Sequence, residues 1–260
     1  MDAHKAYAIA VKDIKEVFSS VSIYGPMVGV PLFFAIVLPV LTFYIAVYAA
    51  PSVISRITTL PLGAVSAASI RSLSFMYFFS INVLGPVFLT IPIFTASVIA
   101  ADSFAGEKER RTSEALLSMP VSTGDLLTGK ILASFIPTML LTIAIFAIYG
   151  VIVNALSVNA FGASVLPTPA WLMMLATSPF LAVATIAIVV FVSSHVKGIK
   201  EAQQISTLLV LPILLMPFIS ILGIANLTVQ FFEYLILWLA IADVAIAYLS
   251  VKSFKKESIL

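Results

Sequence analysis

Few residues in this 260-residue chain have side chains suited to catalysis or metal binding. The chain has no cysteine, and its two histidines, His4 and His195, are far apart in sequence, which argues against thiol chemistry and a dedicated metal site. An intramembrane enzyme would need clustered His, Glu or Asp in its apolar segments, or a serine elbow, and the sequence has neither. The sequence therefore predicts a protein that is not an enzyme.

One stretch, Gly124 to Lys130, has the glycine and lysine spacing of a phosphate-binding loop. In such a loop a Ser or Thr follows the lysine and holds magnesium, and a strand precedes the motif. Here Ile131 follows the lysine and no strand pattern precedes it, so we reject the match. The chain also has no hydrophilic stretch long enough for a nucleotide-binding domain. We expect any ATPase to be a separate polypeptide.

Polar and ionisable residues are rare in the long apolar stretches, where a charge costs roughly a few kcal/mol unless it faces protein or water. Asp243 is such a residue, and it is either part of a transport path or a carboxylate that bonds a neighbouring helix or is protonated. Asn82 either lines a path or bonds two helices together. These two residues are the candidates for a pathway.

Charge is concentrated between Asp102 and Lys130, which we call the first polar segment and which holds nine of the 26 Lys, Arg, Asp and Glu. Ala105 to Met119 is rich in helix formers, and its charges recur at spacings of three and four that allow opposite charges to pair: Glu107, Arg110, Arg111 and Glu114. The alternative is a solvated loop whose charges keep it out of a membrane.

The second half of the first polar segment predicts a helix end and a new start. Pro120 ends the charged helix because a proline disfavours helical geometry in the residue before it. Ser122 to Asp125 then fits a capping box, which predicts that the next helix begins there.

The elements that carry these residues are membrane helices. The chain is 61% hydrophobic and only 10% charged, whereas about a quarter of the residues in a soluble domain are charged. A membrane helix needs about 20 apolar residues, and the chain has long stretches of this kind. We therefore predict an all-α integral membrane protein with one transmembrane domain over residues 1–260. The six predicted spans are at about 27–49, 76–100, 131–153, 170–192, 205–224 and 231–251.

Residues 5–21 precede the first span and are too polar to cross a membrane. Apolar residues recur there at steps of three and four while the lysines fall on other faces, which is the pattern of an amphipathic helix; the apolar residues are Tyr7, Val11, Ile14, Phe18 and Val21. We expect this helix to lie at the inner interface with its lysines toward anionic lipid. The alternative is a short soluble helix packed on loops.

The basic residues predict the orientation. With the N-terminus in the cytoplasm, twelve of the 14 Lys and Arg lie inside, and only Arg56 and Arg71 lie outside. Both termini, the first polar segment and a second one, Ser193 to Gln204, are then cytoplasmic. We expect a multi-pass protein of the cell (plasma) membrane.

The residues of the first polar segment resemble the first cytoplasmic loop of the ABC type-2 permease family. Members often read Gly-Glu-Lys-Glu-Arg-Gly-Thr-x-Glu-Ala-Leu-Leu, then Pro-Val-Ser, then a helix ending in Gly-Lys. The matching residues are Gly106, Glu107, Lys108, Glu109, Arg110, Thr112, Glu114, Ala115, Leu116, Leu117, Pro120, Val121, Ser122, Gly129 and Lys130. Arg111 stands where many relatives have glycine. The second segment, the N-terminal helix and the six-span plan are also similar, so the likeness covers essentially the whole chain.

The resemblance implies a permease subunit of an ATP-binding cassette exporter. Its first polar segment would be the coupling loop, with a coupling helix between spans two and three that sits in a cleft of a separate ATPase. The coupling residues would be Glu107, Lys108, Glu109, Arg110, Arg111, Thr112, Glu114 and Pro120, with Lys197, Glu201, Gln203 and Gln204 in the second loop. A second permease copy, identical or different, would complete the path.

The resemblance also implies which ligands this chain lacks. ATP and Mg would bind to the partner ATPase, leaving no cofactor or metal here, and the partners would include membrane lipid but no nucleic acid. The alternative function is an ATP-independent secondary transporter that uses Asp243 for ion coupling, and composition alone also fits a structural protein. A neighbouring gene for an ATP-binding cassette ATPase would discriminate between them.

Overall fold

The computed structural model describes residues 3–48, 67–109, 122–193, 195–196, 198–224 and 226–253. Within these ranges the regular structure is entirely helical. The helices are α1 (Ala3–Ser19), α2 (Val21–Tyr48), α4 (Ala67–Phe78), the π-helix η1 (Phe79–Leu84), α5 (Gly85–Phe88), α6 (Thr90–Glu109), α8 (Thr123–Phe161), α9 (Pro169–Ser193), α10 (Ile199–Ser206), the 3₁₀ turn η2 (Thr207–Leu209), α11 (Val210–Ile221) and α12 (Val229–Ser253).

Six helical stretches in the described part of the chain are long and apolar enough to cross a membrane, which confirms the predicted all-α membrane class. They are Tyr24–Tyr48, Ser72–Gly106, Gly124–Phe161, Pro169–Ser193, Ile199–Ile221 and Val229–Ile246. The second combines α4, η1, α5 and α6, and the fifth combines α10, η2 and α11. Several therefore extend beyond the roughly 20 residues that the bilayer requires.

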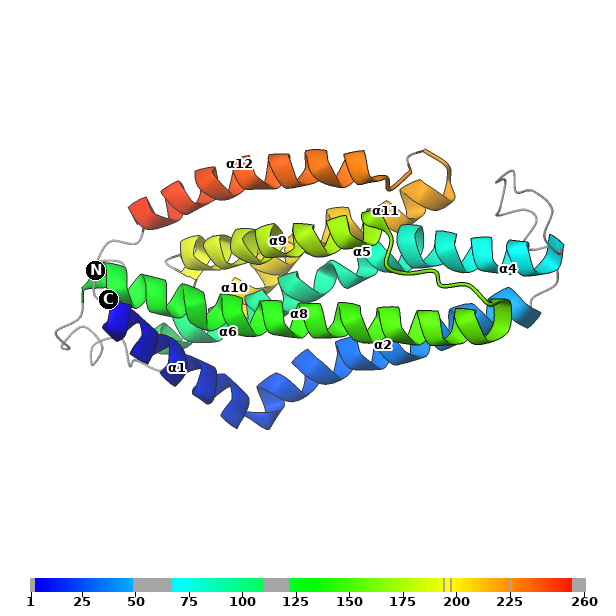
Figure 1. Cartoon of the computed structure of the whole chain (residues 1–260). Coiled ribbons are helices and arrows are strands. Elements are labelled where there is room, and N and C mark those ends of the chain that lie inside the picture. The colour runs from blue at the N-terminus through cyan, green and yellow to red at the C-terminus, as the bar shows by residue number, and fades with distance from the viewer. Residues whose placement is uncertain are drawn as a thin grey trace.

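The helices form one elongated bundle in which the long elements run side by side (Figure 1). The helix α1, the start of α8 and the last turns of α12 lie at the same end of the bundle (Figure 1). We call this the polar end, because α6 ends there at Glu109 and α8 begins there at Thr123, both within the first polar segment. The opposite end carries the turn between α8 and α9.

Toward that opposite end, four large aromatic side chains pack together in the core and hold α5, α8 and α9 in place. The ring centroids of Phe88 and Tyr149 are 4.7 Å apart, and those of Phe146 and Trp171 are 4.6 Å apart. All four side chains are buried, and the Tyr149 hydroxyl donates a hydrogen bond to Ser80 Oγ at 3.0 Å. This rigid cluster anchors the bundle away from the polar end.

Several helix ends differ from their predicted positions, among them the C-terminal ends of α6 and α8. α6 runs without a break to Glu109, so the stretch from Ala105 to Glu109 continues the second long helix instead of starting a separate coupling helix. The rest of the predicted coupling helix, residues 110–121, lies outside the described residues. α8 continues past 153 to Phe161 and ends where Gly162 adopts a φ of 71°, a left-handed conformation that glycine tolerates.

Candidate functional site

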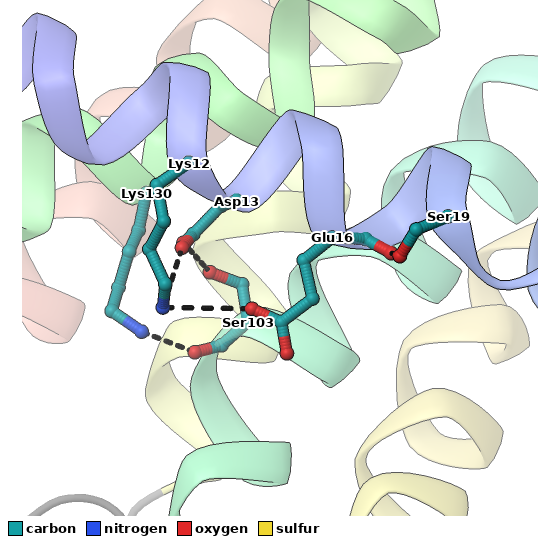
Figure 2. A network of polar contacts seen from close by, with 6 residues as sticks. All are labelled: Lys12, Asp13, Glu16, Ser19, Ser103 and Lys130. Atoms are coloured by element: carbon teal, nitrogen blue, oxygen red, sulfur yellow. Dashed lines mark hydrogen bonds and ion pairs between the residues drawn. The ribbon is translucent and has the colours of Figure 1, made fainter.

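Three helices meet at the polar end around buried polar side chains (Figure 2). Asp13 comes from α1, Ser103 from α6 and Lys130 from α8, and the three are only 6%, 7% and 2% exposed. Ser103 Oγ donates a hydrogen bond to Asp13 Oδ2 at 2.7 Å, and Lys130 Nζ donates to the backbone carbonyl of Ser103. We call these three residues the polar junction.

The buried face of α1 explains why Asp13 belongs to the junction. Ala10, Asp13 and Val17 are spaced by three and four residues, share one helical face, and are all buried. The apolar residues Tyr7 and Phe18, on which the sequence prediction rested, are 68% and 46% exposed. α1 thus contacts the bundle through Ala10, Asp13 and Val17, whereas Tyr7 and Phe18 are exposed and Val11 and Ile14 are partly buried.

A buried carboxylate is stable only where it has hydrogen-bond donors or a cation nearby. Asp13 has both, because Ser103 donates to Oδ2 and Lys12 Nζ lies 3.4 Å from Oδ1. Lys12 Nζ also lies 3.5 Å from Glu16 Oε2, and its own side chain is 61% exposed (Figure 2). The junction is therefore linked to solvent through Lys12 but is otherwise closed.

Lys130 ties the two ends of the first polar segment together. Its ammonium lies 5.2 Å from the centroid of the Phe104 ring, a distance that allows a cation–π contact. Because it also donates to Ser103, the lysine at the end of the segment holds the helix at the beginning of the segment. Gly124 to Lys130 is helical throughout, so the stretch does not form a phosphate-binding loop.

The start of α8 is capped as the sequence predicts. Ser122 has the extended backbone of an N-cap residue, and its hydroxyl accepts a hydrogen bond from the Asp125 amide at 3.1 Å. The same hydroxyl donates to Asp125 Oδ2 at 2.6 Å. The re-entry point of the first polar segment is thus fixed both by a cap and by the polar junction.

The two polar segments contact each other through Glu109. Glu109 Oε2 accepts a hydrogen bond from the backbone amide of Ile199, the first residue of α10, at 2.9 Å. At the other end of α10, the hydroxyls of Ser97 and Ser206 are 2.6 Å apart. α10 therefore lies antiparallel along the last three turns of α6.

A known protein family matches nearly the whole length of the fold, from α1 to α12. Residues 7–250 match the family described as ABC-2 family transporter protein. The chain belongs to this family. The ABC transporter permease protein NatB of Bacillus subtilis (strain 168) is 33% identical to it over 143 residues, which is 53% of this chain and 36% of that relative. The match thus spans little more than a third of the relative's length. This ABC-2 permease is a multi-pass membrane protein, as its sequence predicts.

Most residues predicted to contact an ATPase lie where the structure describes no side chain. Glu107 and Lys108 are in α6, but their side chains lie outside the described part, as do Arg110, Arg111, Thr112, Glu114, Pro120 and Lys197. Their role in this ABC-2 permease stays a prediction. Glu109 is described, and its carboxylate bonds α10 within the same chain.

The last six residues of the second polar segment, Ile199 to Gln204, belong to α10. Glu201 and Gln204 are exposed on it and Gln203 is partly buried. The Gln203 carbonyl accepts a hydrogen bond from the Thr207 hydroxyl at 2.5 Å, at the point where α10 passes into η2. The side chains of Glu201 and Gln204 are exposed, and their contact with a partner stays a prediction.

The two pathway candidates are not brought together. Asn82 lies in η1, where Oδ1 accepts from the Leu227 amide at 3.4 Å, so it bonds the second span to the segment before α12. Asp243 is buried in α12, and its Oδ1 has no hydrogen-bond partner among the described residues. About 20 Å of helix separates Asp243 from the start of α12 near Asn82. The geometry of Asn82 fits the helix-bonding alternative, and a pathway role stays a prediction for both.

Sequence reasoning missed Asp13 and Ser103. The signal for Asp13 was its spacing of three and four from Ala10 and Val17, which places it on a face free of lysine. Ser103 carries no comparable signal, because a serine beside a charged segment usually faces water. Its role in the junction depends on how α1 and α6 pack.

Proposed function

We propose that this permease is the membrane subunit of an ATP-binding cassette exporter that a separate ATPase drives. The observation that supports it most is the family match over residues 7–250. The first polar segment adds a physical argument, because a charged segment anchored at both ends by a buried junction is suited to receive force from outside the bundle. Exposed charges give register and specificity to such a contact more than affinity.

The ATPase would contact residues 110–121 and the neighbouring charges of α6. The proposed contact is formed by Glu107, Lys108, Arg110, Arg111, Thr112, Glu114 and Pro120. Beside it lie the residues proposed from the second polar segment, which are Lys197, Glu201, Gln203 and Gln204. ATP and Mg would bind to the ATPase, and this chain would hold no cofactor. The excess of Lys and Arg at the polar end supports a cytoplasmic location for both termini in the plasma membrane.

The transport path would run between two permease copies, either identical or different, with lipid around them. Two ATPases that close on ATP would pull on the first polar segments and rock the spans against each other. An ion-coupled secondary transporter would depend on Asp243 alone, and the family match does not favour it.

Charge reversal in the first polar segment tests the proposal. In the triple variant Glu107→Lys, Arg110→Glu and Glu114→Lys, we expect the partner ATPase to be lost on co-purification, because the docking charges become repulsive. The control is Arg56→Glu and Arg71→Glu, which reverses charges predicted to lie on the other side of the membrane. If the triple variant retains the ATPase and its transport activity, the proposed coupling is wrong.

A further inference from the structure

The first turn of α10 is capped by a side chain from another helix. The opening amides of any helix lack partners within that helix, and a Ser, Thr, Asn or Asp at the N-cap usually bonds one of them. Here the N-cap residue is Gly198, which has no side chain to do so. Glu109 of α6 supplies the acceptor instead, through its bond to the Ile199 amide. A carboxylate also suits the partial positive charge at a helix N-terminus.

Two glycines make room for this contact. A Cβ on Gly198 would lie 2.9 Å from Glu109 Oε2, and one on Gly106 would lie 3.2 Å from Ile199 Cδ1. The φ of −160° at Gly198 is extended backbone that any residue adopts, so the glycine is needed there for space and not for its conformation. The ends of α6 and α10 are therefore shaped to touch.

The contact between Glu109 and Ile199 lies between the proposed ATPase-binding residues and the fifth membrane span. Glu109 is the last described residue of α6 before residues 110–121, and α10 continues through η2 into α11. The bond between the hydroxyls of Ser97 and Ser206 holds the other end of α10 to α6. Any displacement at the end of α6 thus acts directly on the first turn of the fifth span.

We propose that Glu109 is a positioning residue that transmits movement of the first polar segment to α10 and α11. This rests on the proposed ATP-driven function. It also assigns Glu109 a different role from its neighbours, because its carboxylate bonds this chain's own second polar segment and not the ATPase. Charge-assisted hydrogen bonds of this kind are about twice as strong as neutral ones, which suits a contact that must carry force.

The test measures movement of α11 without needing the substrate. The chain has no cysteine, so spin labels can be placed at Leu211→Cys on α11 and Leu237→Cys on α12, whose side chains are 58% and 61% exposed. In the complex with the ATPase, the label distance is measured with and without ATP and vanadate. We expect the distance to change in the otherwise unmodified chain, and Glu109→Ala to lose most of that change while the ATPase stays bound.

We call the proposed transmission of movement through Glu109 the relay. The variant Gly198→Ser distinguishes this relay from simple capping of α10. Its hydroxyl caps α10 by itself, while its Cβ displaces the Glu109 carboxylate. A relay predicts that Gly198→Ser loses the ATP-dependent change and fails to rescue Glu109→Ala. Glu109→Gln, whose amide oxygen still accepts, should keep most of the change, as should the control Gly150→Ser, where a Cβ meets nothing within 4 Å.

The outcomes are distinct. If Gly198→Ser is neutral and rescues Glu109→Ala, Glu109 is only a cap and the relay is wrong. If Glu109→Ala keeps the full distance change in an ATPase-bound complex, the relay is also wrong, and the proposed function stands. If the unmodified chain binds no ATPase, the proposed function fails and the relay fails with it.

Discussion

At the scale of single residues, the structure gives Lys130 a role that the sequence motifs do not indicate. In the sequence it ends a false phosphate-loop match and a family motif. In the structure it is almost fully buried, lies over Phe104 and donates to the carbonyl of Ser103. A lysine in such a place holds α8 to α6.

Lys130→Met tests this role. Methionine keeps much of the apolar stem but removes the ammonium, which leaves the buried carbonyl of Ser103 without the hydrogen bond that Lys130 donates. We expect a loss of about 2 kcal/mol of stability, seen as a lower unfolding temperature in detergent. The matched control is Lys15→Met, because Lys15 is an exposed lysine of α1 outside the polar junction and its replacement should change stability by about 0.5 kcal/mol or less. Equal unfolding temperatures for the two variants would contradict a structural role for Lys130.

At the scale of helices, the polar end contains two helix N-termini, of α8 and α10, that are capped in different ways, and the helix α1 packed beside them. α8 begins with its own cap, formed by Ser122 and Asp125. α10 begins with a cap borrowed from Glu109. α1 packs through Asp13 and small residues. The first of these was predicted from sequence, because a capping box is local, while the other two require residues about 90 positions away.

Ser122→Ala should loosen the start of α8. Removing an N-cap hydroxyl costs about 1 kcal/mol, so the first-turn amides, beginning with Asp125, should exchange hydrogen faster by roughly fivefold. Thr128→Ala is the control, since the Thr128 hydroxyl bonds the Gly124 carbonyl within the same helix and does not cap its first turn. Faster exchange in both variants alike would show that the cap has no specific effect.

At the scale of the whole molecule, the polar end of the bundle holds α1, the end of α6 and the start of α8, and the other end holds the turn between α8 and α9 (Figure 1). The basic residues predict that the polar end faces the cytoplasm. Because the spans alternate in direction, one accessible position at each end is enough to determine the orientation of the whole bundle.

Single cysteines test this orientation in intact cells. Asn159→Cys lies near the end of α8 and Glu201→Cys on α10, and both side chains are exposed. We expect a membrane-impermeant maleimide to label Asn159→Cys directly and Glu201→Cys only after the cells are made permeable. The reverse pattern would invert the orientation and move the first polar segment outside the cell, where it could not reach an ATPase.

The sequence by itself determined the membrane class, the six apolar helices and the position of the charged segment between the second and third. These follow from hydropathy and local capping patterns, which are properties of neighbouring residues. Only the tertiary structure decided that α1 packs through Asp13, that Lys130 is buried, and that Glu109 bonds α10. Each of these depends on whether a charge finds a partner from a distant part of the chain, and a charge without such a partner stays in water.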